Sequence, residues 1–314
     1  MKLFIQIPCY NEEESLPLVL ESIPKHIDGV DSINILIIDD GSTDKTIAVA
    51  KKHGVTDFVL HSQNRGLARS FSDGIRYCLA NGADIVVNTD GDNQYPQASI
   101  PELVRPILEG KAEIVVADRQ TNKIAHFSPF KKLLQSLGSR VVNLAAGTNI
   151  PDAASGFRAY SRIALQQINV ITEFSYCMET IIHAGRKRIP ISSVPVKTNP
   201  KTRESRLFKN NWEHVRKSGF AIVRSYLMHQ PFKILVTSGL LTLVVGLIPF
   251  IRYLLIVIIN GESAGNHIQS LIAGSVLFIV GVMLIVLGVI ADLIKINRIL
   301  LEDLLEHAKT SKDK

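Results

Sequence analysis

Two aspartates separated by one residue, Asp90 and Asp92, directly follow an apolar run that ends at Asn88. Carboxylate oxygens suit hard divalent cations, and Mg²⁺ is commonly bound by one or two carboxylates together with substrate phosphates. The carboxyl end of a buried strand is also where open α/β sheets bind ligands. The pattern therefore predicts an Mg²⁺ or Mn²⁺ site. The alternative is an ordinary polar turn, because Asp and Gly are common turn residues.

Three further polar segments carry residue types that could serve the same site. Residues 8–12 follow the first apolar run and offer an aromatic side chain, Tyr10, and a carboxylate, Glu12, which could face a base and a ribose. Asp39 begins an Asp-Asp-Gly-Ser turn after the second major apolar run. The segment from Asp152 to Arg158 reads Asp-Ala-Ala-Ser-Gly-Phe-Arg. The first two segments, like Asp90 and Asp92, follow expected strands, and open α/β sheets bind ligands at the carboxyl ends of their strands.

The elements expected to position these side chains alternate over residues 1–120. Short, β-branched runs predict strands, and the amphipathic stretches between them predict helices. The expected strands are Leu3–Ile7, Ile33–Ile38, Phe58–Leu60, Ile85–Asn88 and Ile114–Ala117, and the expected helices are Ser15–Ile23, Asp44–His53, Gly66–Asn81 and Ile100–Glu109. Such alternation predicts an α/β fold with a mostly parallel sheet that has helices on both faces.

Residues 121–150 do not follow this alternation. Apolar side chains recur near helical spacing with basic side chains beside them; they are Phe127, Phe130, Leu133, Leu134 and Leu137, with Lys131, Lys132 and Arg140. The segment is either a basic amphipathic helix on a membrane surface or a helix packed on the sheet. The sequence leaves both possibilities open.

Two long stretches in the last third of the chain are apolar enough to cross a membrane. They cover about 234–259 and 268–291, and each approaches or exceeds the roughly 20 residues needed to span a bilayer. The link between them holds no Lys or Arg, whereas basic residues precede the first stretch and follow the second. The positive-inside rule then predicts a protein of the cell membrane, plasma or inner, with two spans and both termini in the cytoplasm.

The two stretches also contain glycines spaced by seven residues, at 239 and 246 in the first and at 274, 281 and 288 in the second. Small residues allow helices in lipid to approach closely. We expect these faces to pack within a hairpin or between subunits, so a homo-oligomer is possible. The predicted organisation is a catalytic domain (1–204), a basic juxtamembrane segment (205–231), a transmembrane hairpin (232–292) and a cytoplasmic tail (293–314).

Composition supports a polar globular part joined to a lipid-embedded part. Hydrophobic residues make up 46% of the 314 residues, yet 20% are charged. The net charge of +6 is concentrated locally, because seven Lys or Arg and only two Glu lie between Lys201 and Arg224. The three cysteines have no metal-type spacing, which favours reduced thiols in a cytoplasmic compartment. The N-terminal residues predict a strand rather than a signal peptide.

The motifs together resemble those of a known enzyme family. Pro-x-Tyr-Asn-Glu, Asp-Asp-Gly-Ser, Asp-x-Asp-x-Gln and Asp-x-x-Ser-Gly-Phe-Arg occur in that order over residues 1–210. This resembles the inverting family 2 glycosyltransferases of GT-A fold. With two C-terminal spans, the chain is similar to the polyisoprenyl-phosphate glycosyltransferases, which include the dolichyl-phosphate mannose and glucose synthases. The resemblance implies a Rossmann-like GT-A domain followed by a transmembrane hairpin.

The resemblance also implies roles for the acidic residues. The donor-nucleotide set is Pro8, Tyr10, Glu12, Asp39 and Asp90, the Mg²⁺ or Mn²⁺ set is Asp90, Asp92 and Gln94, and the catalytic set is Asp92 and Asp152. A cation there would stabilise the negative charge that develops on the leaving nucleotide. Asp152 would act as a general base or would orient the acceptor or the sugar. A phosphate acceptor is already anionic near neutral pH, so little proton removal is needed.

On the acceptor side the resemblance implies a set of phosphate-binding residues: Arg119, Lys132, Ser136, Arg158 and Arg206, with Arg203 as a further candidate. Arginine can hold a lipid phosphate through paired hydrogen bonds. For Arg119 and Arg158 the alternative is an ion pair with a neighbouring aspartate. For Arg203 and Arg206 the alternative is general attraction to anionic lipids.

The expected reaction is transfer of one hexose from a UDP- or GDP-sugar to polyprenyl or dolichyl phosphate at the cytoplasmic face of the bilayer. Nucleic acid is not an expected partner. A processive polysaccharide synthase is one alternative, but the Gln-x-x-Arg-Trp motif of such enzymes is absent and the only tryptophan is Trp212. The other is a non-catalytic membrane scaffold with a transferase-like domain, which the intact acidic motifs argue against.

Overall fold

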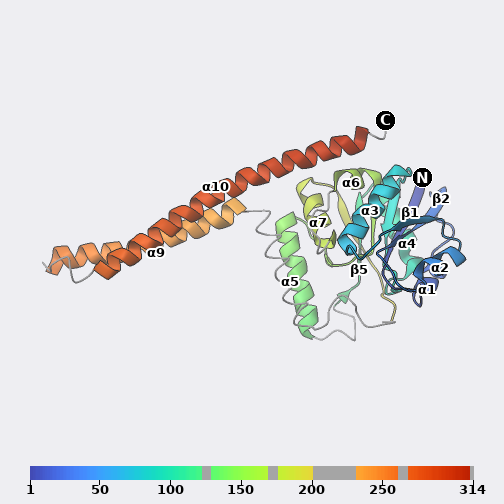
Figure 1. Cartoon of the computed structure of the whole chain (residues 1–314), viewed down its shortest axis with the longest axis horizontal. Coiled ribbons are helices and arrows are strands. Elements are labelled where there is room, and N and C mark those ends of the chain that lie inside the picture. The colour runs from blue at the N-terminus through green and yellow to red at the C-terminus, as the bar shows by residue number, and fades with distance from the viewer. Residues whose placement is uncertain (122–128, 169–175, 201–230, 261–267, 312–314) are drawn as a thin grey trace. The chain divides into compact units, whose positions relative to one another are not determined.

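The computed structural model describes residues 1–121, 129–168, 176–200, 231–260 and 268–311 (Figure 1). The chain divides into two compact units. One contains a β-sheet and the helices packed on it, and the other contains two long C-terminal helices as far as Leu305. The functional side chains predicted from the sequence all belong to the first unit or to residues outside the described ranges.

The first unit is built on a seven-stranded sheet with the order β3-β2-β1-β4-β6-β5-β7. Its strands are β1 (Lys2–Cys9), β2 (Ser32–Asp39), β3 (Asp57–Leu60), β4 (Ile85–Asn88), β5 (Ile114–Asp118), β6 (Arg158–Ser161) and β7 (Ile191–Pro195). The five strands expected from the sequence are all present within one or two residues. The expectation of a mostly parallel sheet is confirmed.

One strand, β6, runs against its neighbours. It pairs antiparallel with both β4 and β5, whereas β1 to β4 pair parallel and β5 is parallel to β7. The carboxyl ends of the parallel strands therefore share one edge with the amino end of β6. This brings the segment that begins at Asp152 to the same edge as the residues that follow β1, β2, β4 and β5.

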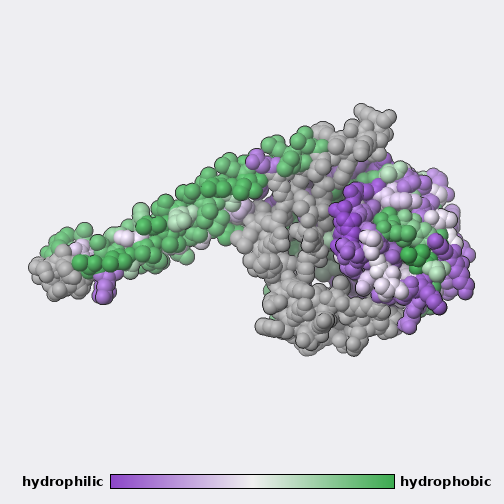
Figure 2. Space-filling model, viewed as in Figure 1, coloured by the Kyte–Doolittle hydropathy of each residue, from purple (hydrophilic) through white to green (hydrophobic). Residues whose placement is uncertain are grey.

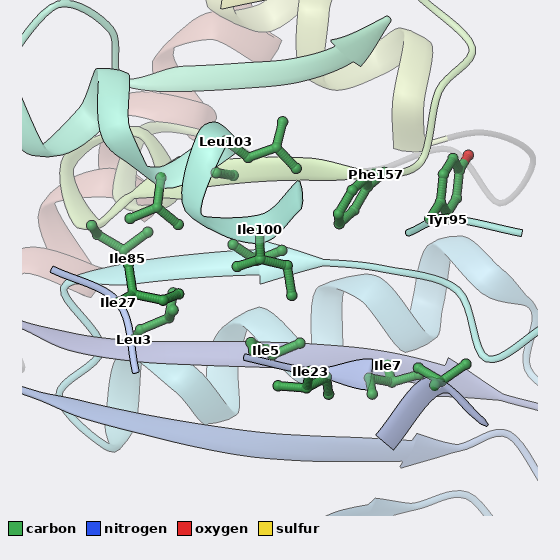
Figure 3. Packing of buried hydrophobic residues seen from close by; sticks show 14 of the residues in the cluster. Leu3, Ile5, Ile7, Ile23, Ile27, Ile85, Tyr95, Ile100, Leu103 and Phe157 are labelled. Atoms are coloured by element: carbon green, nitrogen blue, oxygen red, sulfur yellow. The ribbon is translucent and has the colours of Figure 1, made fainter. Parts of the chain in front are cut away.

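Helices cover both faces of the sheet. In the first unit they are α1 (Leu16–Ser22), α2 (Thr46–Lys52), α3 (Leu67–Ala80), α4 (Ile100–Leu108), α5 (Pro129–Ala146), α6 (Arg162–Gln167) and α7 (Tyr176–Arg186), with a 3₁₀ turn η1 (Gln97–Ser99). Alternate residues of each central strand point to opposite faces. Leu3, Ile5 and Ile7 join the core under α1 and α4 (Figure 3), while Phe4 joins the core under α3 and α7.

Helix α5 lies in the segment for which the sequence left two possibilities open, a helix on the membrane surface or a helix packed on the sheet. Val142 and Ala146 are buried in the core that α3 and α7 share, so this face of the helix packs on the globular unit. Leu133, Leu137 and Leu144 remain exposed on another face. Packing on the unit is therefore confirmed for the buried face, and a membrane role for the exposed face stays a prediction.

The second unit contains α9 (Pro231–Asn260) and α10 (Ile268–Ser311). Over Pro231–Ile259 and Ile268–Leu301 they are long and apolar enough to cross a membrane, and Figure 2 shows the apolar surface along them. Their glycines face each other: a Cβ on Gly239 would lie 2.8 Å from the Gly281 carbonyl oxygen, and one on Gly274 would lie 3.0 Å from that of Gly246. The glycine faces therefore pack within the hairpin, one of the two predicted arrangements.

Candidate active site

The loops after β1 and β2 are joined by side-chain to backbone hydrogen bonds. Asn11 N donates to Ser42 Oγ at 2.9 Å, and Thr43 N donates back to Asn11 Oδ1 at 2.7 Å. Glu12 N donates to Thr46 Oγ1 at 2.8 Å, and this anchors the first loop to the start of α2. The two predicted donor segments thus form one continuous surface at the end of neighbouring strands.

The acidic turn after β4 packs on this surface through Gly91. A Cβ at this position would lie 3.1 Å from Cys9 Sγ and 3.3 Å from Glu12 Cγ, so even a methyl group would require small shifts. The glycine lets the turn lie close against the first loop. Asp90 and Asp92 are consequently held next to the predicted nucleotide-binding residues.

Asp39 has the features of a ligand-binding carboxylate. It is buried, and its Oδ2 accepts a hydrogen bond from Ser42 N at 3.2 Å. Its Oδ1 is also buried, and none of the residues that the structure describes donates to it. A buried acceptor without a partner is unusual, and a bound donor group would satisfy it. Tyr10, by contrast, is 40% exposed. This pair suits a nucleoside, with a polar group on the carboxylate and a ring on the tyrosine.

The donor side has a negative electrostatic potential, because several carboxylates lie close together. Burial raises the pKa of the Cys9 thiol well above its ordinary value, and the charges of Glu12, Asp39, Asp44 and Asp90 raise it further. A diphosphate approaching these carboxylates would be repelled unless a cation lay between them. The acidic set therefore fits a divalent cation on electrostatic grounds.

The predicted cation ligands lie within one turn. Gln94 Nε2 donates to Asp92 Oδ2 at 2.8 Å, and Gln94 N lies 3.1 Å from Asp92 Oδ1. In this arrangement Gln94 orients Asp92, and its role as a direct ligand stays a prediction. Within the described ranges, no three Asp, Glu, His or Cys side chains gather as a metal centre. Two neighbouring carboxylates suit a cation that phosphates also bind.

On the acceptor side, Arg119 and Asp152 form a bidentate ion pair. Arg119 Nε donates to Asp152 Oδ2 at 2.6 Å and its terminal nitrogen to Oδ1 at 2.9 Å, with side-chain exposures of 15% and 3%. Burial alone would lower the pKa of Arg119, but Tyr95 and Asp152 outweigh it and the pKa is raised. The predicted acceptor arginine and catalytic aspartate therefore lie together, in the ion pair that was the alternative interpretation for Arg119.

Arg158 does not fit the predicted role in acceptor binding. Its side chain is fully buried, and its nitrogens donate to the carbonyl oxygens of Ala153, Ser155 and Cys177 and to Thr180 Oγ1 at 2.7–2.8 Å. A buried guanidinium that already donates four hydrogen bonds within the protein is not accessible to a phosphate. The burial and the hydrogen bonds disfavour the predicted role, and they fix the Asp152 segment to α7.

Lys132 and Ser136 lie one turn apart on α5, and Ser136 is exposed. The same helix contacts the Asp152 segment, because Ala153 N donates to Ser139 Oγ at 3.1 Å. Asn143 also bonds both backbone groups of Ile150, each at 2.9 Å. The helix that carries Lys132 and Ser136 is thus anchored to the segment that carries Asp152. Arg203 and Arg206 lie outside the described residues.

Two supporting groups were missed by the sequence interpretation. His61 lies between Asp40 (Nδ1 to Oδ1, 2.7 Å) and Asp73 (Nε2 to Oδ2, 3.1 Å), next to the Asp39 turn. Asn199 holds the acidic turn from outside: its N donates to the Gln94 carbonyl at 2.9 Å and its Nδ2 to that of Asn93 at 3.0 Å. The sequence carried no motif for either residue, since both act through partners far along the chain.

Comparison with known proteins identifies the family. Residues 4–168 match the model of "Glycosyl transferase family 2". The chain is 30% identical over 217 residues to the UDP-N-acetylglucosamine–dolichyl-phosphate N-acetylglucosaminyltransferase of Methanococcus voltae, covering 62% of this chain and 85% of the relative. It is 30% identical over 176 residues to the undecaprenyl-phosphate mannosyltransferase of Micrococcus luteus, covering 54% and 70%.

Among solved structures, glucosyl-3-phosphoglycerate synthase from Mycobacterium tuberculosis has the same fold. The match has a TM-score of 0.57 at 20% identity and covers 72% of this chain and 78% of the other. That crystal structure contains Mn²⁺ and UDP-glucose, and another of the same enzyme contains Mg²⁺ and UDP. The family match, together with four acidic and polar segments at one sheet edge, establishes that this chain belongs to glycosyl transferase family 2, in the group of polyisoprenyl-phosphate glycosyltransferases.

Proposed function

We propose that this protein transfers one hexose, with inversion, from a UDP- or GDP-sugar to polyprenyl or dolichyl phosphate at the cytoplasmic face of the membrane. One observation carries the proposal: the acidic turn with Asp90 and Asp92 and the Arg119–Asp152 pair share one sheet edge, in a chain with two helices apolar enough to span a bilayer. The names of the relatives from Methanococcus voltae and Micrococcus luteus support a lipid-phosphate acceptor.

The donor would bind along the ends of β1, β2 and β4. The unpartnered Asp39 Oδ1 would accept a hydrogen bond from the nucleoside, and Tyr10 and Pro8 would line its ring. Asp90, Asp92 and Gln94 would hold Mg²⁺ or Mn²⁺ against the diphosphate. When bound, that cation neutralises the charge of the diphosphate and of the leaving nucleotide.

The acceptor would approach from the side of β5 and α5. A phosphate oxygen attacks the anomeric carbon from the face opposite the nucleotide, while the bond between that carbon and the diphosphate oxygen breaks. The electron pair of the broken bond leaves with the nucleoside diphosphate, and the new glycosidic bond has the inverted configuration. Arg119, with Lys132 and Ser136 on α5, would hold the phosphate in line.

In this proposal Asp152 is a positioning group more than a base. Its two oxygens accept from Arg119, so it fixes the plane of the guanidinium that would bind the phosphate. Phosphate monoesters lose their second proton near pH about 6, so the nucleophile is already charged at neutral pH. A proton acceptor is therefore not required for the transfer step.

The arrangement in the membrane follows from the distribution of charge. The link at 260–267 contains no Lys or Arg, whereas Lys295 and Arg298 follow the second apolar stretch and basic residues crowd before the first. Both termini would then be cytoplasmic. The boundaries at 204, 231 and 292, and assembly into oligomers through the helices, remain part of the proposal.

The test is a transfer assay on membranes that contain the full chain. A panel of UDP- and GDP-sugars is supplied with polyprenyl or dolichyl phosphate and Mg²⁺ or Mn²⁺, and the lipid product is identified by mass spectrometry. Asp92→Asn should lower the rate at least about a hundredfold, because it removes a charge that acts in the transition state. Asp28→Asn, at a fully exposed carboxylate, is the matched control and should leave the rate unchanged.

The other outcomes are equally distinct. A product carrying more than one sugar would indicate a processive polymerase, and full activity of the Asp92→Asn variant would refute the cation site. Membranes with well-inserted protein and no transfer from any tested donor would favour the non-catalytic scaffold.

A further inference from the structure

Gly156 joins the acidic turn to the Asp152 segment through both of its backbone groups. Its N donates to Tyr95 Oη at 3.0 Å, and its carbonyl oxygen accepts from Asn88 Nδ2 at 2.9 Å and from Tyr176 Oη at 3.3 Å. Asn88 and Tyr95 lie on either side of Asp90 and Asp92 in the sequence. One residue of the acceptor-side segment is therefore held from both ends of the cation-binding turn.

The residues that hydrogen-bond to Gly156 are buried and are themselves held in place. Asn88 is fully buried and Tyr95 is 4% exposed. Asn88 Oδ1 accepts from Gln6 Nε2 at 2.9 Å, which fixes the orientation of the amide that reaches Gly156. A Cβ on Gly156 would lie 2.8 Å from Tyr176 Oη and 3.5 Å from Asp90 Oδ2. The Gly156 backbone thus also lies close to the carboxylate of Asp90.

Tyr95 lies between the two charged parts of the site. Its ring stacks on Phe157 at a centroid distance of 5.1 Å and an angle of 24° (Figure 3). Burial raises the pKa of its phenol, Arg119 opposes this, and Asp90 and Asp152 add to it. The hydroxyl oxygen accepts the Gly156 N–H at 3.0 Å, so the hydrogen bond and the ring stacking together tie Tyr95 to the Asp152 segment.

We propose that Tyr95 is a positioning residue that fixes the distance between the cation-binding carboxylates and the Arg119–Asp152 pair through its hydrogen bond with Gly156. The inference rests on the proposed function, in which these two groups hold the donor and the acceptor. Misplacing reacting groups by about 1 Å can cost roughly a hundredfold in rate. A buried hydrogen bond between the two segments is thus a means of setting that distance.

The decisive variant is Tyr95→Phe, which keeps the ring and its stacking on Phe157 and removes one oxygen. Hydrogen–deuterium exchange of the full chain in detergent is measured with and without Mn²⁺ and UDP or GDP. In the wild type, nucleotide binding should slow exchange both in residues 9–12 and in residues 153–157. In Tyr95→Phe, nucleotide affinity and the protection of 9–12 should be retained within about twofold, and the added protection of 153–157 should be lost.

Kinetics provide a second measurement. Tyr95→Phe should lower the kcat of transfer about tenfold, while the KM for the nucleotide sugar and the slow hydrolysis of the donor by water remain within about twofold. Tyr176→Phe removes the bond to the Gly156 carbonyl and the 2.8 Å bond that Tyr176 Oη accepts from Asn88 Nδ2, but keeps the Tyr95 bond to Gly156, so it should lower transfer in the same direction by a smaller factor. Tyr77→Phe is the matched control, because Tyr77 donates to Asp57 at 2.6 Å away from the site.

The two proposals fail in different ways. Equal losses of transfer and hydrolysis in Tyr95→Phe, or retained protection of 153–157, would overturn the positioning role. A wild type that binds nucleotide but transfers to no lipid phosphate would overturn the proposed acceptor, and the exchange experiment would still decide the role of Tyr95. A wild type without cation-dependent nucleotide binding would overturn both.

Discussion

The donor side and the acceptor side of this site manage charge in different ways. On the donor side Glu12, Asp39, Asp44 and Asp90 lie close enough to act together on Cys9, and one oxygen of Asp39 has no partner among the described residues. On the acceptor side Arg119 and Asp152 already neutralise each other. Under the proposed function, the donor side would bind its diphosphate through an added cation, whereas the acceptor side would present a guanidinium that Asp152 already holds in place.

Two arginines of the acceptor side show the same contrast at a smaller scale. Arg119 is 15% exposed and donates to the Asp152 carboxylate through Nε and one terminal nitrogen, so a phosphate could bind the remaining guanidinium N–H groups. Arg158 is fully buried, and three backbone carbonyls and a hydroxyl surround it. The first can take part in binding, and the second holds the fold of the loop.

The largest expected effect belongs to Arg158→Met. It leaves several buried acceptors without a donor, and removing one partner of a buried charged network costs about 3–5 kcal/mol. For a unit of this size that corresponds to a fall in melting temperature of about 10 °C, measured in detergent by size-exclusion chromatography after heating. Arg105→Met, at an exposed position of α4, is the control and should leave the melting temperature unchanged. A stable Arg158→Met protein that had lost only acceptor affinity would reverse the distinction between the two arginines.

The sequence could not separate these arginines, and the reason is physical. Both follow motifs at the sheet edge, and both were assigned to the acceptor phosphate. Their roles depend on β6, whose four residues Arg158–Ser161 carry no alternating pattern and pair antiparallel between β4 and β5. The pairing of this short strand decides that the Arg158 side chain points into the interior. The hydropathy pattern of its four residues does not predict that pairing.

The donor side was far more predictable. Asp39 ends one β-branched strand and Asp90 lies two residues beyond another, so knowing the strands was enough to bring both to one edge. Tyr95, Asn199 and His61 were missed because they act through hydrogen bonds to residues far along the chain, such as Gly156 at 61 positions from Tyr95. The spacing of residues in the sequence predicts which strands and helices lie side by side when they alternate regularly. It does not predict which side chains form hydrogen bonds between those elements.

A smaller effect, about a hundredfold in kcat, is expected for Asp152→Asn, because the amide can no longer hold Arg119 through two charged hydrogen bonds.

A separate prediction concerns the pH dependence of the wild-type protein. Its transfer rate should follow ionisation of the acceptor phosphate, so activity should fall as the pH drops below about 6. Replacing the phosphate by a phosphonate of higher second pKa should move this acid limb of the pH–rate profile to higher pH.

The measurement compares the two acceptors in the wild type. A limb that stays at the same pH for both would assign it to the enzyme and would make Asp152 a true general base.

The smallest predicted effect tests the donor side alone. Asp39→Asn keeps the shape of the side chain and its place beside Ser42 but removes the charge of the unpartnered oxygen. A lost charge-assisted hydrogen bond to the nucleoside should raise the KM for the nucleotide sugar about tenfold and leave kcat nearly unchanged. The inhibition constant of the free nucleoside diphosphate should rise by the same factor, since the bond is made to a part that both molecules share. A fall in kcat at constant KM would instead tie Asp39 to the transfer step, and the separation of nucleotide binding from chemistry would have to be abandoned.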